Sequence, residues 1–151
     1  MIAEGVAQVF EADTTGKAAI GHGYTYSGHP VGAAAALACL AETKRLKVNE
    51  NAAARGAELF AGVQALMAKH ALIGDVRGGH GLMIALELVA DRATKKPADK
   101  AVTGRVQETA YREGAMVRVS GLNIILSPPL VITSADVQTI LSALDAGLAA
   151  A

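Results

Sequence analysis

Residues 21–30, which read GHGYTYSGHP, are the most unusual stretch for chemistry in this sequence. Three glycines and several hydroxyl side chains lead to Pro30, and proline is favoured at the first position of a helix. The free N–H groups and the dipole of a helix N-terminus favour an anion such as phosphate, to which the Thr25 hydroxyl can donate. The alternative is a capped helix entry whose glycines only shape the turn. On spacing alone we favour this alternative over a phosphate contact at Thr25.

Arg118 is the second candidate, because it lies between Val117 and Val119 in a short segment typical of a strand. Side chains alternate along a strand, so Arg118 should point to the face opposite the two valines. A guanidinium in that position can bind a substrate carboxylate through two parallel hydrogen bonds. A solvent-facing arginine on a half-buried strand explains the same pattern, and without further information we favour it.

Other residue types with chemical potential form no convincing site. His22 and His29 are seven residues apart in a loop, without a carboxylate or thiol in register, so we expect no metal site. Ser27 is not in the Gly-x-Ser-x-Gly pattern of serine hydrolases. Residues 78–81, Gly-Gly-His-Gly, do not match the dinucleotide-binding fingerprint. Cys39 lies among small residues, where we expect a buried space-filling side chain.

The pattern of apolar residues predicts the elements that position these candidates. Residues 13–29 and 91–97 are expected to be loops, with the second loop strongly polar. Thr133, with Asp136 three residues later, is the expected cap of the last helix, and Asn49 is the expected cap of an earlier one. The order predicts an α+β fold, a short antiparallel sheet with helices packed on one face. The expected helices are 1–12, 30–47, 49–70, 98–113 and one from 133 onward, and the expected strands are 76–77, 82–89, 116–119 and 123–126.

Composition narrows the class of protein. The 151 residues carry 14 basic and 14 acidic side chains, so no nucleic-acid or membrane partner is indicated. A net charge of zero favours self-association. One cysteine allows no intramolecular disulfide, which suits a reducing compartment. We expect no signal peptide and no membrane span, and therefore a cytoplasmic protein.

Two blocks of this sequence resemble the omega-amino-acid–pyruvate branch of the class III aminotransferases. Residues 22–30, HGYTYSGHP, match a late motif of that family, and Arg118 followed by residues 123–130, NIILSPPL, matches its C-terminal motif. The order and separation of the blocks also agree. The resemblance implies a homodimer of fold type I that uses pyridoxal 5'-phosphate, in which a small C-terminal domain closes over the substrate.

The resemblance also implies roles for individual residues. Thr25 matches the threonine that reaches across the dimer interface to the cofactor phosphate of the neighbouring subunit, and Tyr24 would lie beside it. Arg118 matches the mobile arginine that binds a substrate carboxylate and swings away for a substrate without one. The implied reaction moves an amino group from an amine or omega-amino acid to a keto acid such as pyruvate, with the cofactor supplying the chemistry.

This sequence departs from the family pattern in one important respect. The lysine that forms the Schiff base with the cofactor lies upstream of this chain in the family, and Lys17 does not match it. We therefore expect no transamination by this chain alone. The resemblance assigns residues 1–30 to the truncated end of the large cofactor-binding domain, 31–72 to connecting helices and 73–151 to the small domain.

Two other functions remain open. The chain could be a non-enzymatic folded module for interaction or dimerisation, which would form a stable oligomer that ignores the cofactor. It could also be one half of a split aminotransferase, which would co-purify with a partner polypeptide that supplies the lysine.

Overall fold

The computed structural model describes residues 2–18, 21 and 23–151. The chain divides into two compact units, Met1–Leu40 and Ala41–Ala151. None of the helices in the described residues is long and apolar enough to cross a membrane.

The first unit contains α1 (Glu4–Glu11) and most of α2 (Pro30–Arg45), which begins at the expected proline. Asp13 organises the loop between them. Its Oδ1 accepts hydrogen bonds from the Thr15 hydroxyl (2.6 Å) and the Thr15 amide (2.9 Å), and its Oδ2 accepts one from the Ala18 amide (2.7 Å). These bonds, led by that of the Thr15 hydroxyl, stabilise the charged carboxylate and lower the pKa of Asp13 to about 2.

The second unit is built on an antiparallel sheet with the strand order β1-β2-β5-β4. Its strands are β1 (Ile73–Arg77), β2 (Ile84–Asp91), β4 (Arg118–Ser120) and β5 (Asn123–Leu126), and the short β3 (Lys96–Pro97) pairs with the end of β2. Along β2 and β5, alternate residues are buried, because one face of the sheet packs against helices. The opposite face of the sheet carries the polar side chains and Arg118.

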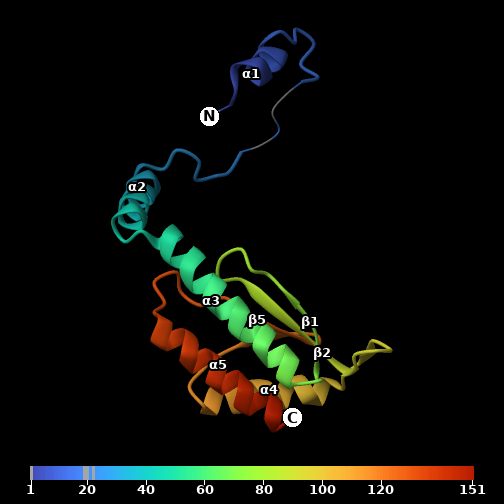
Figure 1. Ribbon diagram of the computed structural model, residues 1–151. Helices are drawn as coiled ribbons and strands as arrows, with labels where there is room; N and C mark the ends of the chain where they lie inside the picture. Colours follow the sequence, from blue (N-terminus) through green and yellow to red (C-terminus); the bar gives the residue numbers. More distant parts are fainter. Residues whose placement is uncertain (1, 19–20, 22) are drawn as a thin grey trace. The chain divides into compact units, whose positions relative to one another are not determined.

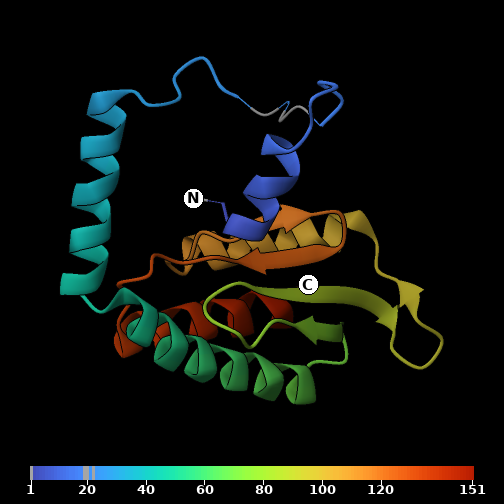
Figure 2. The ribbon, with the colours of Figure 1, turned by 90° about the horizontal axis from the view of Figure 1, so that it is seen from above.

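Helices α3 (Val48–Lys69), α4 (Lys100–Arg112) and α5 (Ser134–Ala149) form the layer on the buried face, with α5 in contact with both of the others (Figures 1 and 2). The expected α+β architecture, with helices on one face of an antiparallel sheet, is confirmed. Each fully buried leucine or isoleucine contributes about 1.5–3 kcal/mol. The core side chains that join the two layers include Leu59, Val63, Ile73, Ile84, Leu86, Leu88, Val106, Ile124, Val137 and Leu144.

The expected cap of α5 is confirmed, whereas the expected cap of α3 is wrong. The Thr133 hydroxyl accepts from the Asp136 amide, and the Asp136 carboxylate accepts from the Thr133 amide (2.9 Å), which completes a capping box. Helix α3 instead begins at Val48, after Lys47 has turned the chain in the left-handed region (φ 50°). Asn49 therefore lies inside the first turn.

Two further expectations differ from the structure. The loop 91–97 contains β3, which is too short to show the alternation by which strands are predicted. Cys39, expected to be buried, is exposed, because no residue of α2 is buried within the described chain.

Candidate functional site

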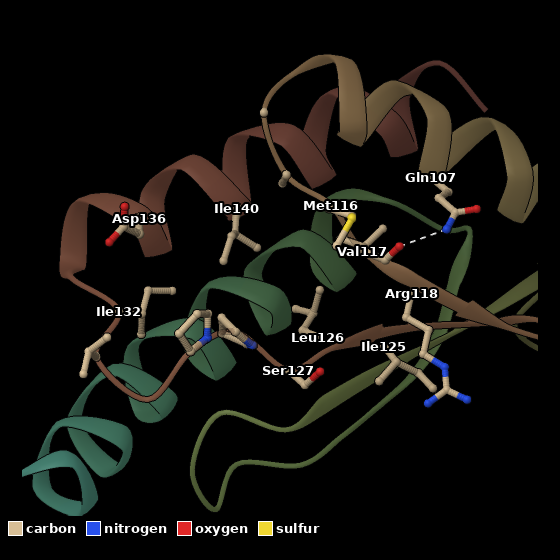
Figure 3. A pocket seen from close by; sticks show the side chains of 15 residues that line it. Gln107, Met116, Val117, Arg118, Ile125, Leu126, Ser127, Ile132, Asp136 and Ile140 are labelled. Carbon is tan, nitrogen blue, oxygen red and sulfur yellow. Dashed lines mark hydrogen bonds between the residues drawn. The ribbon is translucent and has the colours of Figure 1, made fainter. Parts of the chain in front are cut away.

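Arg118 is the first residue of β4, an edge strand of the sheet, and its side chain points away from the helices (Figure 3). Val117 before it is buried, Val119 after it is half-buried, and Arg118 itself is exposed, as the alternation predicts. Its cross-strand neighbour on β5 is Ile125, so an apolar side chain lies directly beside the guanidinium stem.

A cavity of about 700 Å³ lies next to Arg118, and Figure 3 shows how its walls are arranged. One wall is the segment 114–118, which leads into β4. A second is the end of β5 with the following loop, and a third is the N-terminal half of α5. Most of the lining is apolar, and the polar groups are few. The lining residues are Gln107, Gly114, Ala115, Met116, Val117, Arg118, Ile125, Leu126, Ser127, Pro128, Pro129, Val131, Ile132, Asp136 and Ile140.

The charges on the open face of the sheet distinguish Arg118 on β4 from Arg77 on β1. The Nη1 atom of Arg77 lies 2.9 Å from Asp75 Oδ2 and 2.6 Å from Glu87 Oε2, and its Nη2 donates to Asn123 Oδ1 at 2.6 Å. Glu87 and then Asp75 raise the pKa of Arg77 by stabilising its charge. The Arg118 side chain has no hydrogen bond or ion pair within the part of the chain that the structure describes. Its donors are therefore available to an anion.

The one carboxylate that lines the cavity is already engaged. Asp136 Oδ2 accepts from the hydroxyl and the amide of Thr133, and these bonds lower the pKa of Asp136. Because Asp136 serves the N-terminus of α5, it does not neutralise Arg118. The cavity thus presents one unpaired cation beside an apolar lining, which suits an organic anion.

The segment around Thr25 lies in the first unit, apart from Arg118 in the sequence, and it forms a turn ahead of α2. The Ser27 amide donates to the Tyr24 carbonyl (2.9 Å), and the Tyr24 amide donates to Ser27 Oγ (3.1 Å). His29 Nδ1 accepts a hydrogen bond from the Gly32 amide (3.3 Å) and so caps the N-terminus of α2. A capped helix entry is the alternative that the sequence favoured. The Thr25 and Tyr24 side chains are exposed. His22, the first residue of this block, lies outside the described residues.

Thr25 and Tyr24 belong to the first unit, and Arg118 belongs to the second. A second, smaller cavity of about 420 Å³ adjoins the entry of α2. Its lining residues are Tyr26, Gly28, His29, Gly32 and Ala33, and these do not include Thr25 or Tyr24. Among the described residues, no group of three His, Cys, Asp or Glu side chains is arranged to hold a metal ion.

Sequence reasoning missed two side-chain amides that contact the walls of the larger cavity. Gln107 Nε2 donates to the Val117 carbonyl (2.9 Å), one residue before Arg118. Asn51 Nδ2 donates to the carbonyls of Leu130 (2.8 Å) and Ile132 (2.9 Å). The prolines at 128 and 129 were the available signal, because a segment without N–H groups needs donors from elsewhere.

Comparisons with known proteins agree over almost the whole chain. The family model for class-III aminotransferases matches residues 3–148. Taurine–pyruvate aminotransferase of Bilophila wadsworthia is 38% identical over 128 residues, which cover 80% of this chain and 28% of the relative. Diaminobutyrate–2-oxoglutarate transaminase of Halomonas elongata is 38% identical over 146 residues, which cover 94% of this chain and 31% of the relative.

A solved structure has a similar fold. The PLP-bound amine transaminase from an uncultivated Pseudomonas species is 44% identical and superposes with a TM-score of 0.86, covering 95% of this chain and 32% of that one. The chain therefore spans about a third of the length of the proteins that it matches.

Proposed function

Because this chain belongs to the class-III aminotransferase family, we propose that it forms the C-terminal part of an enzyme that moves an amino group from an amine or omega-amino acid to a keto acid such as pyruvate. Class-III aminotransferases depend on pyridoxal 5'-phosphate, which supplies the electron sink for amino transfer when it is bound. The resemblance found in two sequence motifs is thereby confirmed at the level of the family. The roles of single residues are our proposals.

The observation that carries the proposal is the unpaired guanidinium of Arg118 at the mouth of an apolar cavity. A carboxylate can accept two hydrogen bonds from such a group, while the remainder of the ligand contacts the lining around Ile125. Arg77, on the same face of the sheet, is excluded from this role by its own carboxylate partners. We therefore propose that Arg118 binds the carboxylate of an amino-acid or keto-acid substrate.

The test measures binding of 3-phenylpropionate and its neutral amide to the 151-residue chain by NMR at constant ionic strength. The signal followed is the backbone amide of Ile125, which lines the cavity and is present in every variant. We expect the carboxylate to bind at least about threefold more tightly than the amide, a modest ratio because the site is open to water. Arg118→Met should abolish this preference. Arg105→Met is the matched control, because Arg105 is also exposed and has no ion pair among the described residues. An unchanged preference in Arg118→Met would refute the role of Arg118.

The residues around Thr25 fit a phosphate contact by their donor chemistry. The exposed Thr25 hydroxyl has no hydrogen bond within the described residues, so its donor is available. We propose that Thr25 donates to the cofactor phosphate of a neighbouring subunit and that Tyr24 contributes to the same pocket. This chain would then provide one edge of a cofactor site whose lysine lies in another part of the enzyme.

The proposal that the Schiff-base lysine lies in another part of the enzyme can be tested directly. The chain is titrated with pyridoxal 5'-phosphate and reduced with borohydride, and the labelled peptides are mapped. Since no lysine here matches the family motif, we expect weak labelling spread over exposed lysines and no formation of alanine from pyruvate and an amine. Lys17 is exposed and nearest in sequence to the Thr25 turn. Stoichiometric labelling of Lys17, or alanine formation at an enzymatic rate, would show that the chain builds its own catalytic site.

The assignment of residue ranges to domains is also part of this proposal. Residues 1–30 would be the end of the large domain, 31–72 the connecting helices and 73–151 the small domain. The exposed apolar side chains of α2, such as Leu37 and Leu40, support packing against further polypeptide in a dimer. A single cysteine is consistent with a cytoplasmic location.

A further inference from the structure

The two walls that flank Arg118 have few backbone hydrogen bonds of their own. Strand β4 has three residues and, among the described residues, pairs only with β5, so no described strand lies on its other side. The loop after β5 begins Ser127-Pro128-Pro129, and neither proline has an N–H group to donate. Side-chain donors from the helical layer therefore add to the few backbone bonds of both walls.

Asn51 holds the loop. Its Nδ2 donates to the Leu130 carbonyl at 2.8 Å and to the Ile132 carbonyl at 2.9 Å, which uses both protons of one amide across about eighty residues of sequence. The Ile132 amide also donates to the Pro129 carbonyl (3.1 Å), so the loop is closed as a turn. Since the Ile132 side chain is buried in the core, the amide and the isoleucine together fix the far end of this wall.

Gln107 holds the strand. Its Nε2 donates to the Val117 carbonyl at 2.9 Å, and the carbonyl belongs to the peptide unit that leads into Arg118 (Figure 3). Gln107 is half-buried on α4, and the Val117 side chain is buried below it. A hydrogen bond at this point limits rotation about the backbone that carries the arginine.

We propose that Asn51 and Gln107 are positioning residues that fix the two walls of the Arg118 cavity and thereby its affinity for a carboxylate. The inference rests on the proposed carboxylate-binding role of Arg118. Asn51 does not line the cavity, whereas Gln107 does. Each acts through the backbone, Asn51 through residues 130 and 132 and Gln107 through residue 117.

The first measurement is amide hydrogen exchange in the 151-residue chain. Asn51→Asp removes both donors without changing the size of the side chain, and Asn49→Asp is its matched control. Both positions lie in the first turn of α3, where a negative charge interacts similarly with the helix dipole. We expect exchange of the Ile132 amide to be at least about fivefold faster in Asn51→Asp than in the control, because two hydrogen bonds are lost. The Leu88 amide, bonded to the Leu122 carbonyl (2.9 Å) in the sheet, reports global unfolding and should change equally in both variants.

The second measurement repeats the 3-phenylpropionate titration and again follows the backbone amide of Ile125. Gln107→Met removes the donor at similar length without placing a charge beside Arg118, and Gln64→Met on the exposed face of α3 is its control. We expect Asn51→Asp and Gln107→Met each to weaken binding by at least about threefold, while the control variants bind as the parent does. If Asn51→Asp does not fold, Asn51→Ser replaces it, because serine removes the amide without adding charge.

The outcomes separate the two proposals. Faster exchange at Ile132 with weaker carboxylate binding supports the inference. Exchange at Ile132 that rises only in step with Leu88, or affinity equal to that of the controls, overturns it. If Arg118→Met itself leaves the carboxylate preference unchanged, the role of Arg118 fails, whatever the exchange of Ile132.

Discussion

A close backbone contact between α3 and the turn before β2 gives a sharp test of the packing in the second unit. Gly56 is buried on α3, and a Cβ atom added there would lie 2.3 Å from the Gly81 carbonyl oxygen and 2.5 Å from its carbonyl carbon. The clash is with backbone, and Gly81 is itself in the left-handed region (φ 83°). Gly56→Ala must therefore move the helix or the turn by about 1 Å to restore an ordinary contact.

Two opposing effects set the size of the change. Alanine in place of glycine inside a helix gains about 1 kcal/mol of stability. Overpacking against a rigid neighbour costs about 1–3 kcal/mol or more, and here the neighbour is backbone, so the cost is at the upper end. We expect Gly56→Ala to lower the free energy of unfolding by about 1–2 kcal/mol, which lowers the Tm by about 2–8 °C.

The assay is thermal unfolding followed by circular dichroism, with Gly104→Ala on α4 as the matched control. Gly104 is exposed, and a Cβ atom there meets nothing within 4 Å. The control should therefore show the helical gain alone and raise the Tm by about 2–4 °C. If Gly56→Ala raised the Tm as Gly104→Ala does, α3 would not approach the turn as described, and the reasoning would be wrong.

Two further predictions concern polar contacts of α5. The pKa of Asp145 is lowered, and the largest cause is the hydrogen bond from His70. The stability that this carboxylate provides is therefore present above its unfolded pKa, near 3.9. It is lost as the pH falls through the lower pKa of the folded state. Asp145→Asn should therefore remove part of the loss of Tm as the pH falls below about 4, and parallel pH profiles for parent and variant would contradict this. Thr133→Ala should lower stability by about 1 kcal/mol, since it removes the hydroxyl half of the capping box with Asp136, and a Tm within error of the parent would show that the cap contributes nothing.

Elements with strong local signals were predictable from the sequence. The last helix carries its start signal at Thr133 and an apolar stripe that the core indeed buries, including Val137 and Leu144. Alternation also gave the direction of Arg118 correctly. These signals are local, because each depends on residues within one turn or one strand.

The predictions that were wrong, and the contacts that were not predicted, depend on distant residues or on backbone geometry. Lys47 adopts a left-handed conformation that its residue type does not signal, so the cap of α3 was placed at Asn49. Asn51 donates to a loop about eighty residues later in the sequence, and an asparagine in a helix gives no sequence signal for such a distant partner. The availability of Arg118 likewise follows from strand register, which places the carboxylates Asp75 and Glu87 beside Arg77.

The two candidate sites differ in what supports them. The Arg118 cavity, its lining and its supporting amides all belong to Ala41–Ala151, which has its own core, so carboxylate binding should be a property of this unit itself. The turn around Thr25 is held by bonds among its own neighbours and precedes a helix of 16 residues, none of which is buried within the described chain. A helix of that length is marginal in water without packing, so a phosphate contact at Thr25 needs a surface against which α2 can pack. Arg118 can therefore be tested in this chain, whereas the proposed role of Thr25 needs a test in which further polypeptide packs against α2.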